Sequence, residues 1–333
     1  MRYSSWMLRL AVATAAFVSA ACSSGADRAP TPDSSATAVA AGSGTPVMSL
    51  LGEPLPPRPM SAEVRAGLEA KLEEARAAYD RAPLDADSII WFGRRLAYLE
   101  RYNDAIGVFT EGIEKHPNDA RMYRHRGHRY ISVRRFDDAV ADLQKAADLV
   151  RNTPDEVEPD GAPNARGIPL STTNGNIYYH LALAHYLKGD YEPSLAAWQE
   201  ALRISTNDDT RVAVTDWLYM TLRRLGRDDE ARALLTPITA DLEIIENSAY
   251  LRRLLFYKGQ LPADSLLVPG QTDELQYVTQ GYGVGNWYLA EGDTARATEI
   301  FDRVLATNYW AAFGYIAAEA DVARRRAGTR ATD

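Results

Sequence analysis

GRRLAYLERYNDAIGVF, residues 93–109, and GHRYISVRRFDDAVADL, residues 127–143, are two copies of one pattern, 34 residues apart. Gly93 and Gly127 occupy equivalent positions in the two copies, as do Phe109 and Leu143. Small and large apolar residues that recur at this period predict one helical hairpin in each unit, which cannot bury its apolar face alone. A stack of hairpins that forms an extended binding surface is therefore the expected architecture.

The pattern extends beyond these two copies. Ala182, Leu222 and Gly285 lie in later units of the same kind, and the turns at residues 100–105 and 134–139 join the two helices of a hairpin. With these turns and spacings the chain resembles the tetratricopeptide repeat family. The resemblance implies an all-α fold, a right-handed α-solenoid of helical hairpins.

The predicted organisation follows the pattern along the chain. In order, the expected segments are a signal peptide at 1–21, a disordered tether at 22–60, an N-terminal capping helix at 61–85, two repeats at 86–153, a proline-rich insert at 154–174, two repeats at 175–245, a degenerate hairpin at 246–277, a fifth repeat at 278–309 and a C-terminal capping helix at 310–328. The composition of residues 22–60, rich in Ser, Ala, Gly, Thr and Pro, cannot offset its ordering entropy, which favours a flexible tether.

The N-terminus has the features of an export signal. A positive start is followed by an apolar run at residues 10–18, and small residues then precede Cys22, the only cysteine of the chain. This arrangement resembles the lipobox of bacterial lipoproteins, where the thiol is lipidated. Ser23 after it favours the outer membrane, facing the periplasm. The alternative is ordinary signal-peptidase cleavage after Ala20.

Charge and hydropathy exclude some partners. The formal net charge is −8, so nucleic acid is not expected as a general partner, because phosphate binding needs a basic field. No stretch after the signal peptide approaches the roughly 18 apolar residues of a membrane helix. Contact with a membrane is therefore expected through the lipid anchor only.

First helices of successive hairpins are expected to line a concave groove. The side chains near the buried small residue of each first helix are rich in arginine and tyrosine, which suit carboxylates and extended peptides. The predicted groove contacts are Arg94, Tyr98, Arg124, His128, Tyr179, Asp216 and Arg223. They predict a non-catalytic scaffold or adaptor of the cell envelope that binds a protein or peptide, with an acidic or C-terminal carboxylate segment as the favoured ligand. An ordinary solvated helix surface is the alternative interpretation.

Two other functions are compatible with the pattern. One is a periplasmic module for a small ligand or glycan, with the insert as a lid over the groove. The other is an enzyme with an unfamiliar site built from Glu246, Asp216 and His180, which we rank last, so no catalytic residue and no cofactor is predicted.

No metal is predicted either. The histidine pairs lack the glutamate of an HExxH motif, and the acidic run at 155–161 lacks the last ligand of a calcium loop.

Overall fold

The computed structural model describes residues 46–267, 274–307 and 309–330, which belong to one compact unit, Gly42–Asp333. The predicted signal peptide, Cys22 and most of the predicted tether lie outside the described residues. None of the helices in the described part of the chain is long and apolar enough to cross a membrane.

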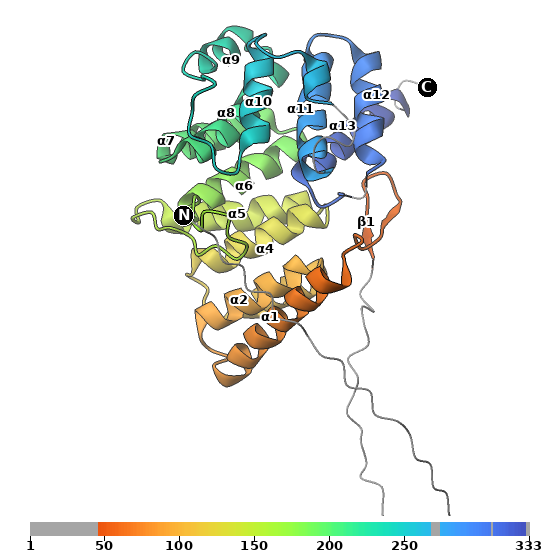
Figure 1. The fold of residues 1–333 in the computed structure, drawn as a ribbon. Helices are drawn as coiled ribbons and strands as arrows, with labels where there is room; N and C mark the ends of the chain where they lie inside the picture. The colour runs from red at the N-terminus through yellow and green to blue at the C-terminus, as the bar shows by residue number, and fades with distance from the viewer. Residues whose placement is uncertain (1–45, 268–273, 308, 331–333) are drawn as a thin grey trace, which may run out of the picture. The chain divides into compact units, whose positions relative to one another are not determined.

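Most of the described chain is helical, and its helices form antiparallel hairpins stacked in chain order (Figure 1). The helices are α1 (Ala62–Arg81), α2 (Ala86–Tyr98), α3 (Tyr102–Lys115), α4 (Ala120–Ser132), α5 (Phe136–Val150), α6 (Thr173–Lys188), α7 (Tyr191–Ile204), α8 (Asp208–Arg224), α9 (Asp228–Leu234), α10 (Ser248–Tyr257), the 3-10 helix η1 (Ala263–Ser265), α11 (Glu274–Ala290), α12 (Thr294–Leu305) and α13 (Phe313–Arg330). Successive first helices contact one another, α2 with α4, α4 with α6, α6 with α8, α8 with α10 and α10 with α11. The predicted all-α solenoid is confirmed.

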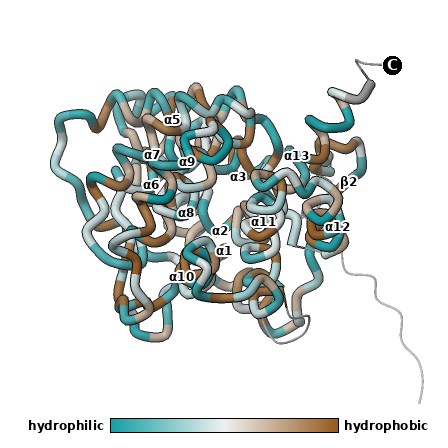
Figure 2. The backbone as a smooth tube through the Cα atoms, turned by 90° about the horizontal axis from the view of Figure 1, so that it is seen from above, coloured by the Kyte–Doolittle hydropathy of each residue, from teal (hydrophilic) through white to brown (hydrophobic). Residues whose placement is uncertain are grey.

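The contacts between small and large residues in the structure repeat with the spacing of the sequence. An added Cβ on Gly93 would lie 2.5 Å from the Phe109 ring, and one on Gly127 would lie 2.6 Å from Leu143. In the last hairpin, Gly285 and Phe301 stand in the same relation, at 2.5 Å. Each glycine therefore lets the second helix of its hairpin approach closely enough to bury a large side chain. Hydrophobic and hydrophilic residues alternate along the helices, as this packing requires (Figure 2).

The turns inside the hairpins need a left-handed residue. Four of them use glycine, at positions 189, 226, 259 and 292, whereas the first two hairpins have Glu100 (φ 60°) and Arg134 (φ 66°) at this point. A non-glycine residue in this conformation costs about 1–2 kcal/mol. Both side chains form ion pairs with distant parts of the chain: Glu100 with Arg58 at 3.2 Å and Arg134 with Glu319 at 2.6 Å.

The segment that precedes α1 is folded, which corrects the C-terminal part of the predicted tether. Strands β1 (Val47–Met48) and β2 (Pro54–Leu55) pair as a small antiparallel hairpin, and Leu55 is buried. The indole nitrogen of Trp310 donates to the Pro56 carbonyl at 2.6 Å, and the Leu50 amide donates to Glu319. These contacts order the segment although its composition alone predicts a flexible chain.

Helix α13 does more than cap the end of the stack. It contacts α11 and α12, as a cap would, and also α6 near the middle of the solenoid. Arg134, in the turn between α4 and α5, pairs with Glu319 of α13, and both side chains are buried. Besides covering the last hairpin, α13 therefore lies against the face of the first helices.

Candidate functional site

The proline-rich insert lies against helices α2 and α4. Arg94 donates from Nη1 to the Pro159 carbonyl at 2.8 Å, and Arg95 donates from Nη1 to the Gly161 carbonyl at 3.0 Å. Arg94 also stacks over the Trp91 ring, 4.4 Å from its centre. We call Arg94, Arg95, Tyr98 and Arg124 the arginine face. It holds the main chain of the insert by two guanidinium groups.

Glu158 of the insert is the carboxylate that the arginine face binds. Its Oε1 lies 3.1 Å from Arg124 Nη2, and its Oε2 accepts from Asn176 Nδ2 at 3.0 Å. Both side chains of the ion pair are about one-tenth exposed, at 8% for Arg124 and 10% for Glu158. Arg124 Nη1 also lies 2.9 Å from His125 Nδ1. A charge-assisted contact in so little solvent is among the stronger polar interactions.

Gly161 is the second buried residue of the insert at this face. A Cβ at this position would lie 2.1 Å from the Tyr98 hydroxyl and 3.0 Å from Arg94 Nη2. Its backbone is not left-handed, unlike that of Gly167 (φ +64°), so the requirement for glycine at 161 is one of space. The insert thus fits the arginine face at two points, a carboxylate and a residue without a side chain.

The two ends of the insert are tied together and to the residues just before α8 and α10. The Glu158 amide donates to the Ser171 carbonyl at 3.0 Å, which closes the loop. Asn164 donates to Glu246 at 2.6 Å, and Asn207 donates to the Leu170 carbonyl at 2.8 Å. A hollow of about 340 Å³ with mostly polar lining residues lies between the insert, the start of α8 and the residues just before α10. It is lined by Asp160, Ala162, Asn164, Leu170, Ser171, Thr210, Glu246 and Asn247.

His128 and Tyr179, two further predicted groove contacts, face helix α13. The His128 ring lies 4.2 Å from that of His180 and 5.4 Å from Phe313 of α13. The Tyr179 hydroxyl lies 3.2 Å from that of Tyr250, and its ring packs edge-on against Trp198. Burial lowers the pKa of His128 and of His180 well below the ordinary value, so both rings are neutral.

The prediction that Asp216 lines an open groove is wrong. Its side chain is fully buried and pairs with Arg253 of α10, whose Nε donates to Asp216 Oδ1 at 2.8 Å. Arg253 also donates to the Thr279 carbonyl at 2.5 Å, and α11 can pass so close to it because Gly283 has no side chain. The pair joins α8, α10 and α11 in the interior.

Arg223 lies apart from the arginine face. It pairs with Asp228 and Glu291, both at 2.8 Å, and its Nη1 donates to the Tyr219 hydroxyl at 3.1 Å. Of the seven predicted groove contacts, the structure brings Arg94, Tyr98 and Arg124 together around one segment. His128 and Tyr179 both lie against His180 and Phe313, and Asp216 and Arg223 have partners elsewhere.

Sequence reasoning placed Tyr186, Arg224, Tyr282 and Asn286 on the face of the first helices but missed Asp321, their partner on α13. They form a buried network in which Arg224 and Asp321 are 2.6 Å apart. It also missed Arg95, Glu158 and Asn176. The acidic run around Glu158 was a usable signal, because it is the natural complement of arginine-rich helices.

The described residues do not assemble the alternative catalytic set. His180 Nδ1 lies 2.6 Å from the Asn176 carbonyl, Asp216 pairs with Arg253, and Glu246 accepts from Asn164. Within the described ranges, no three His, Cys, Asp or Glu side chains gather as metal ligands would.

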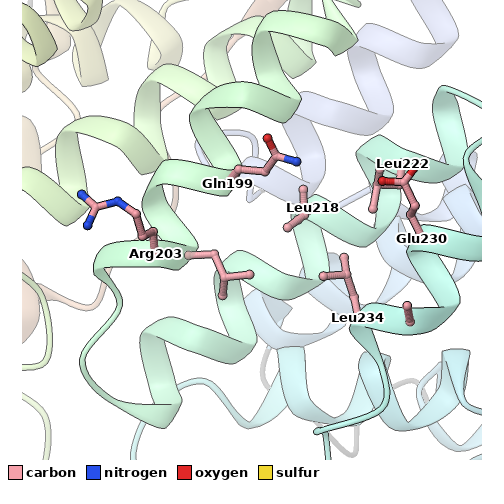
Figure 3. Close-up of a pocket in the computed structure, with 8 residues that line it drawn as sticks. Gln199, Arg203, Leu218, Leu222, Glu230 and Leu234 are labelled. Carbon is pink, nitrogen blue, oxygen red and sulfur yellow. The ribbon is translucent and has the colours of Figure 1, made fainter.

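A shallow apolar hollow of about 420 Å³ lies between α7, α8 and α9 (Figure 3). It exists because α9 has seven residues and leaves part of α7 and α8 uncovered. It is lined by Gln199, Leu202, Arg203, Leu218, Leu222, Glu230, Ala233 and Leu234.

Comparison with known proteins adds little to this description. No protein-family model and no curated protein matches the chain. Among solved structures, YrrB, a TPR protein with an unusual peptide-binding site, is 18% identical over 70% of this chain and 92% of its own, with a TM-score of 0.41. A tetratricopeptide repeat protein from Parabacteroides merdae is 12% identical over 77% of this chain and 94% of its own, with a TM-score of 0.46. BtubC from P. vanneervenii is 17% identical over 74% and 90%, with a TM-score of 0.43. At these sequence identities and TM-scores, neither the partners nor the binding sites of these proteins can be assigned to this chain.

Proposed function

We propose that this chain is a non-catalytic scaffold of the bacterial cell envelope that binds a protein or peptide partner through its arginine face. The observation that supports it is the docked insert. Arg94, Arg95 and Arg124 already hold an extended acidic segment by a carboxylate and two main-chain carbonyls. A segment of another protein offers the same groups.

The energy of these contacts is large enough for recognition. A hydrogen bond to a charged group is worth about 1.5–3 kcal/mol, and the arginine face makes several of them to one short segment. Because main-chain carbonyls are present in every peptide, Arg94 and Arg95 supply affinity. Arg124 supplies the preference for an acid.

A partner would have to compete with the insert. The insert belongs to the same chain, so its effective concentration at the arginine face is on the order of millimolar. The proposed scaffold therefore binds weakly when the insert is docked and more tightly when it is released.

The envelope location is part of the proposal and rests on the N-terminal sequence. Lipidated Cys22 would hold the scaffold at the membrane. Membrane fractionation of the full chain and of Cys22→Ser tests it: we expect the variant to move to the soluble fraction. An unchanged distribution would contradict the anchor.

A second candidate function is supported by the polar hollow beneath the insert. Its six polar lining residues and its volume of about 340 Å³ suit a small hydroxylated ligand such as a sugar, with the insert as the lid. Saturation-transfer NMR with a panel of envelope sugars tests this candidate. Contacts that disappear in Glu246→Ala would favour it over the scaffold.

The scaffold is tested by crosslinking in intact envelopes followed by affinity purification of the full chain. We expect Arg94→Ala combined with Arg124→Ala to lose the partners that the wild-type chain captures. The matched control is Arg151→Ala with Arg203→Ala, which removes two arginines that are each 67% exposed and form surface pairs only. Equal capture by all three proteins would show that the arginine face does not bind the partner.

A further inference from the structure

We propose that the arginine face selects a partner segment with the pattern Glu-x-x-Gly, which we call the register. Tyr98 is the residue that excludes any side chain at the glycine position. The inference rests on the proposed function and specifies the partner's chemistry. The partner carries an extended, acidic segment in which glutamate is followed three residues later by glycine. The insert is the copy of this segment that the chain carries within itself.

The burial pattern of the insert gives the register. Between residues 151 and 163 only Glu158 and Gly161 are buried, and the residues around them are exposed. Both positions contact the arginine face, Glu158 through Arg124 and Gly161 through Arg95 and Tyr98, and the chain bends at Gly161. The arginine face therefore recognises two positions of the segment, and the neighbouring side chains remain in solvent.

The glutamate position is defined by two donors of different kinds. Arg124 pairs with one carboxylate oxygen and Asn176 donates to the other, at 3.1 and 3.0 Å. Glutamine keeps the shape but loses the charge, and would leave the buried Arg124 unpaired. Burial already lowers the pKa of Arg124, so its unpaired cation would be costly in this site.

The glycine position is defined by Tyr98. Its hydroxyl lies 2.1 Å from where a Cβ would go, so it would have to shift, and it also accepts from Arg94 Nη2 at 3.3 Å. Its ring lies 5.6 Å from the Arg95 guanidinium. Displacing Tyr98 would therefore disturb both arginines that hold the peptide carbonyls.

A peptide titration tests the register directly. The probe is a fluorescent peptide with the sequence of residues 155–163, and the receptor is the full chain with the insert released by Glu158→Gln and Gly161→Val. We expect this receptor to bind the peptide at least about tenfold more tightly than the wild-type chain, because the competing segment no longer occupies the face. Circular dichroism checks that the released receptor keeps its helices.

The peptide variants separate recognition from charge. We expect Glu158→Gln or Gly161→Ala in the peptide to weaken binding at least about tenfold. The matched control is Glu156→Gln, which removes the same charge from an exposed position and should bind within about twofold. If the released receptor does not fold, the same peptides are titrated against the wild-type chain at higher peptide concentration. We expect the same order of affinities there.

Tyr98 is tested by a change of specificity. In a released receptor that also carries Tyr98→Ala, we expect the Gly161→Ala peptide to bind as well as the unchanged one, which loss of stability alone would not produce. If all peptides bind alike while envelope capture still depends on Arg94 and Arg124, the register is wrong and the scaffold stands. If no peptide binds and capture does not depend on these arginines, both proposals fail.

Discussion

Arg134 occupies a position where four other hairpins have glycine, and its side chain explains why. Its guanidinium lies against Glu319 of α13 and donates to the Trp310 carbonyl at 2.8 Å. The cost of the left-handed backbone is thus offset by contacts that hold α13 against the first helices. Glu100 does the same for the N-terminal segment through Arg58.

Replacing Arg134 should therefore destabilise the protein strongly. Arg134→Ala leaves the buried Glu319 carboxylate without its cation, and we expect a loss of about 3–5 kcal/mol in the free energy of unfolding. Arg135→Ala, at the next and exposed position, should cost less than about 1 kcal/mol. Urea unfolding followed by circular dichroism measures both. Similar losses would mean that the buried pair contributes no more than a surface pair.

Buried neutral histidines make stability depend on pH. Burial lowers the pKa of His125, His128 and His180 well below 6.5 in the fold, whereas the unfolded chain takes up protons as the pH falls through that value. The unfolded state then binds more protons, so stability is lost below about pH 6.5, by up to about 1.4 kcal/mol per pH unit for each histidine.

The histidine prediction is checked by urea unfolding between pH 7 and pH 5. His180→Leu should remove about a third of the slope that these three histidines produce. The control is His116→Gln, because the contact of His116 with the Leu84 carbonyl is exposed. A slope that His180→Leu leaves unchanged would show that this ring is not excluded from water.

At the scale of the helices, the 34-residue period decides how each hairpin packs. Gly127 and Leu143 illustrate it, since the leucine side chain fills the space that the glycine leaves. We expect Gly127→Ala to cost about 1–3 kcal/mol through overpacking. Gly107→Ala in α3, where an added Cβ meets nothing within 4 Å, should be neutral or stabilise by up to about 1 kcal/mol. Equal effects in urea unfolding would contradict the packing rule.

The spacing predicts the regular hairpins well because small and large residues within one unit are in direct contact. It fails where contacts join distant parts of the chain. Arg134 and Glu319 are 185 residues apart, and no local pattern links them. For the same reason the composition of residues 46–60 predicts a tether, although Trp310 and Glu319 order that segment.

The candidate site was predictable only in part. Arg94, Tyr98 and Arg124 follow from helix geometry, since they lie near the buried glycines of α2 and α4. The same rule places Asp216 in the groove, but the irregular unit after α9 brings Arg253 onto it. Nothing in the spacing indicates that the insert supplies the ligand.

At the scale of the whole described unit, the face of the first helices is covered by the chain itself. The insert covers α2 and α4, and α13 reaches α6 and α11. The α13 contacts include the buried Arg134–Glu319 pair, whereas most of the insert is exposed and is held by polar contacts with the arginine face and with Asn207 and Glu246. The insert is therefore the element that a partner can replace.

Hydrogen–deuterium exchange of the insert tests this account most directly. In the wild-type chain, the Glu158 amide donates to Ser171 and the Thr173 amide donates to Glu156, so both should exchange slowly. We predict that Arg94→Ala with Arg124→Ala speeds exchange across residues 155–173 at least about tenfold, with α11 and α12 unchanged. Arg151→Ala with Arg203→Ala should leave it as in the wild type. Equal exchange in the three proteins would contradict the claim that the arginine face holds the insert.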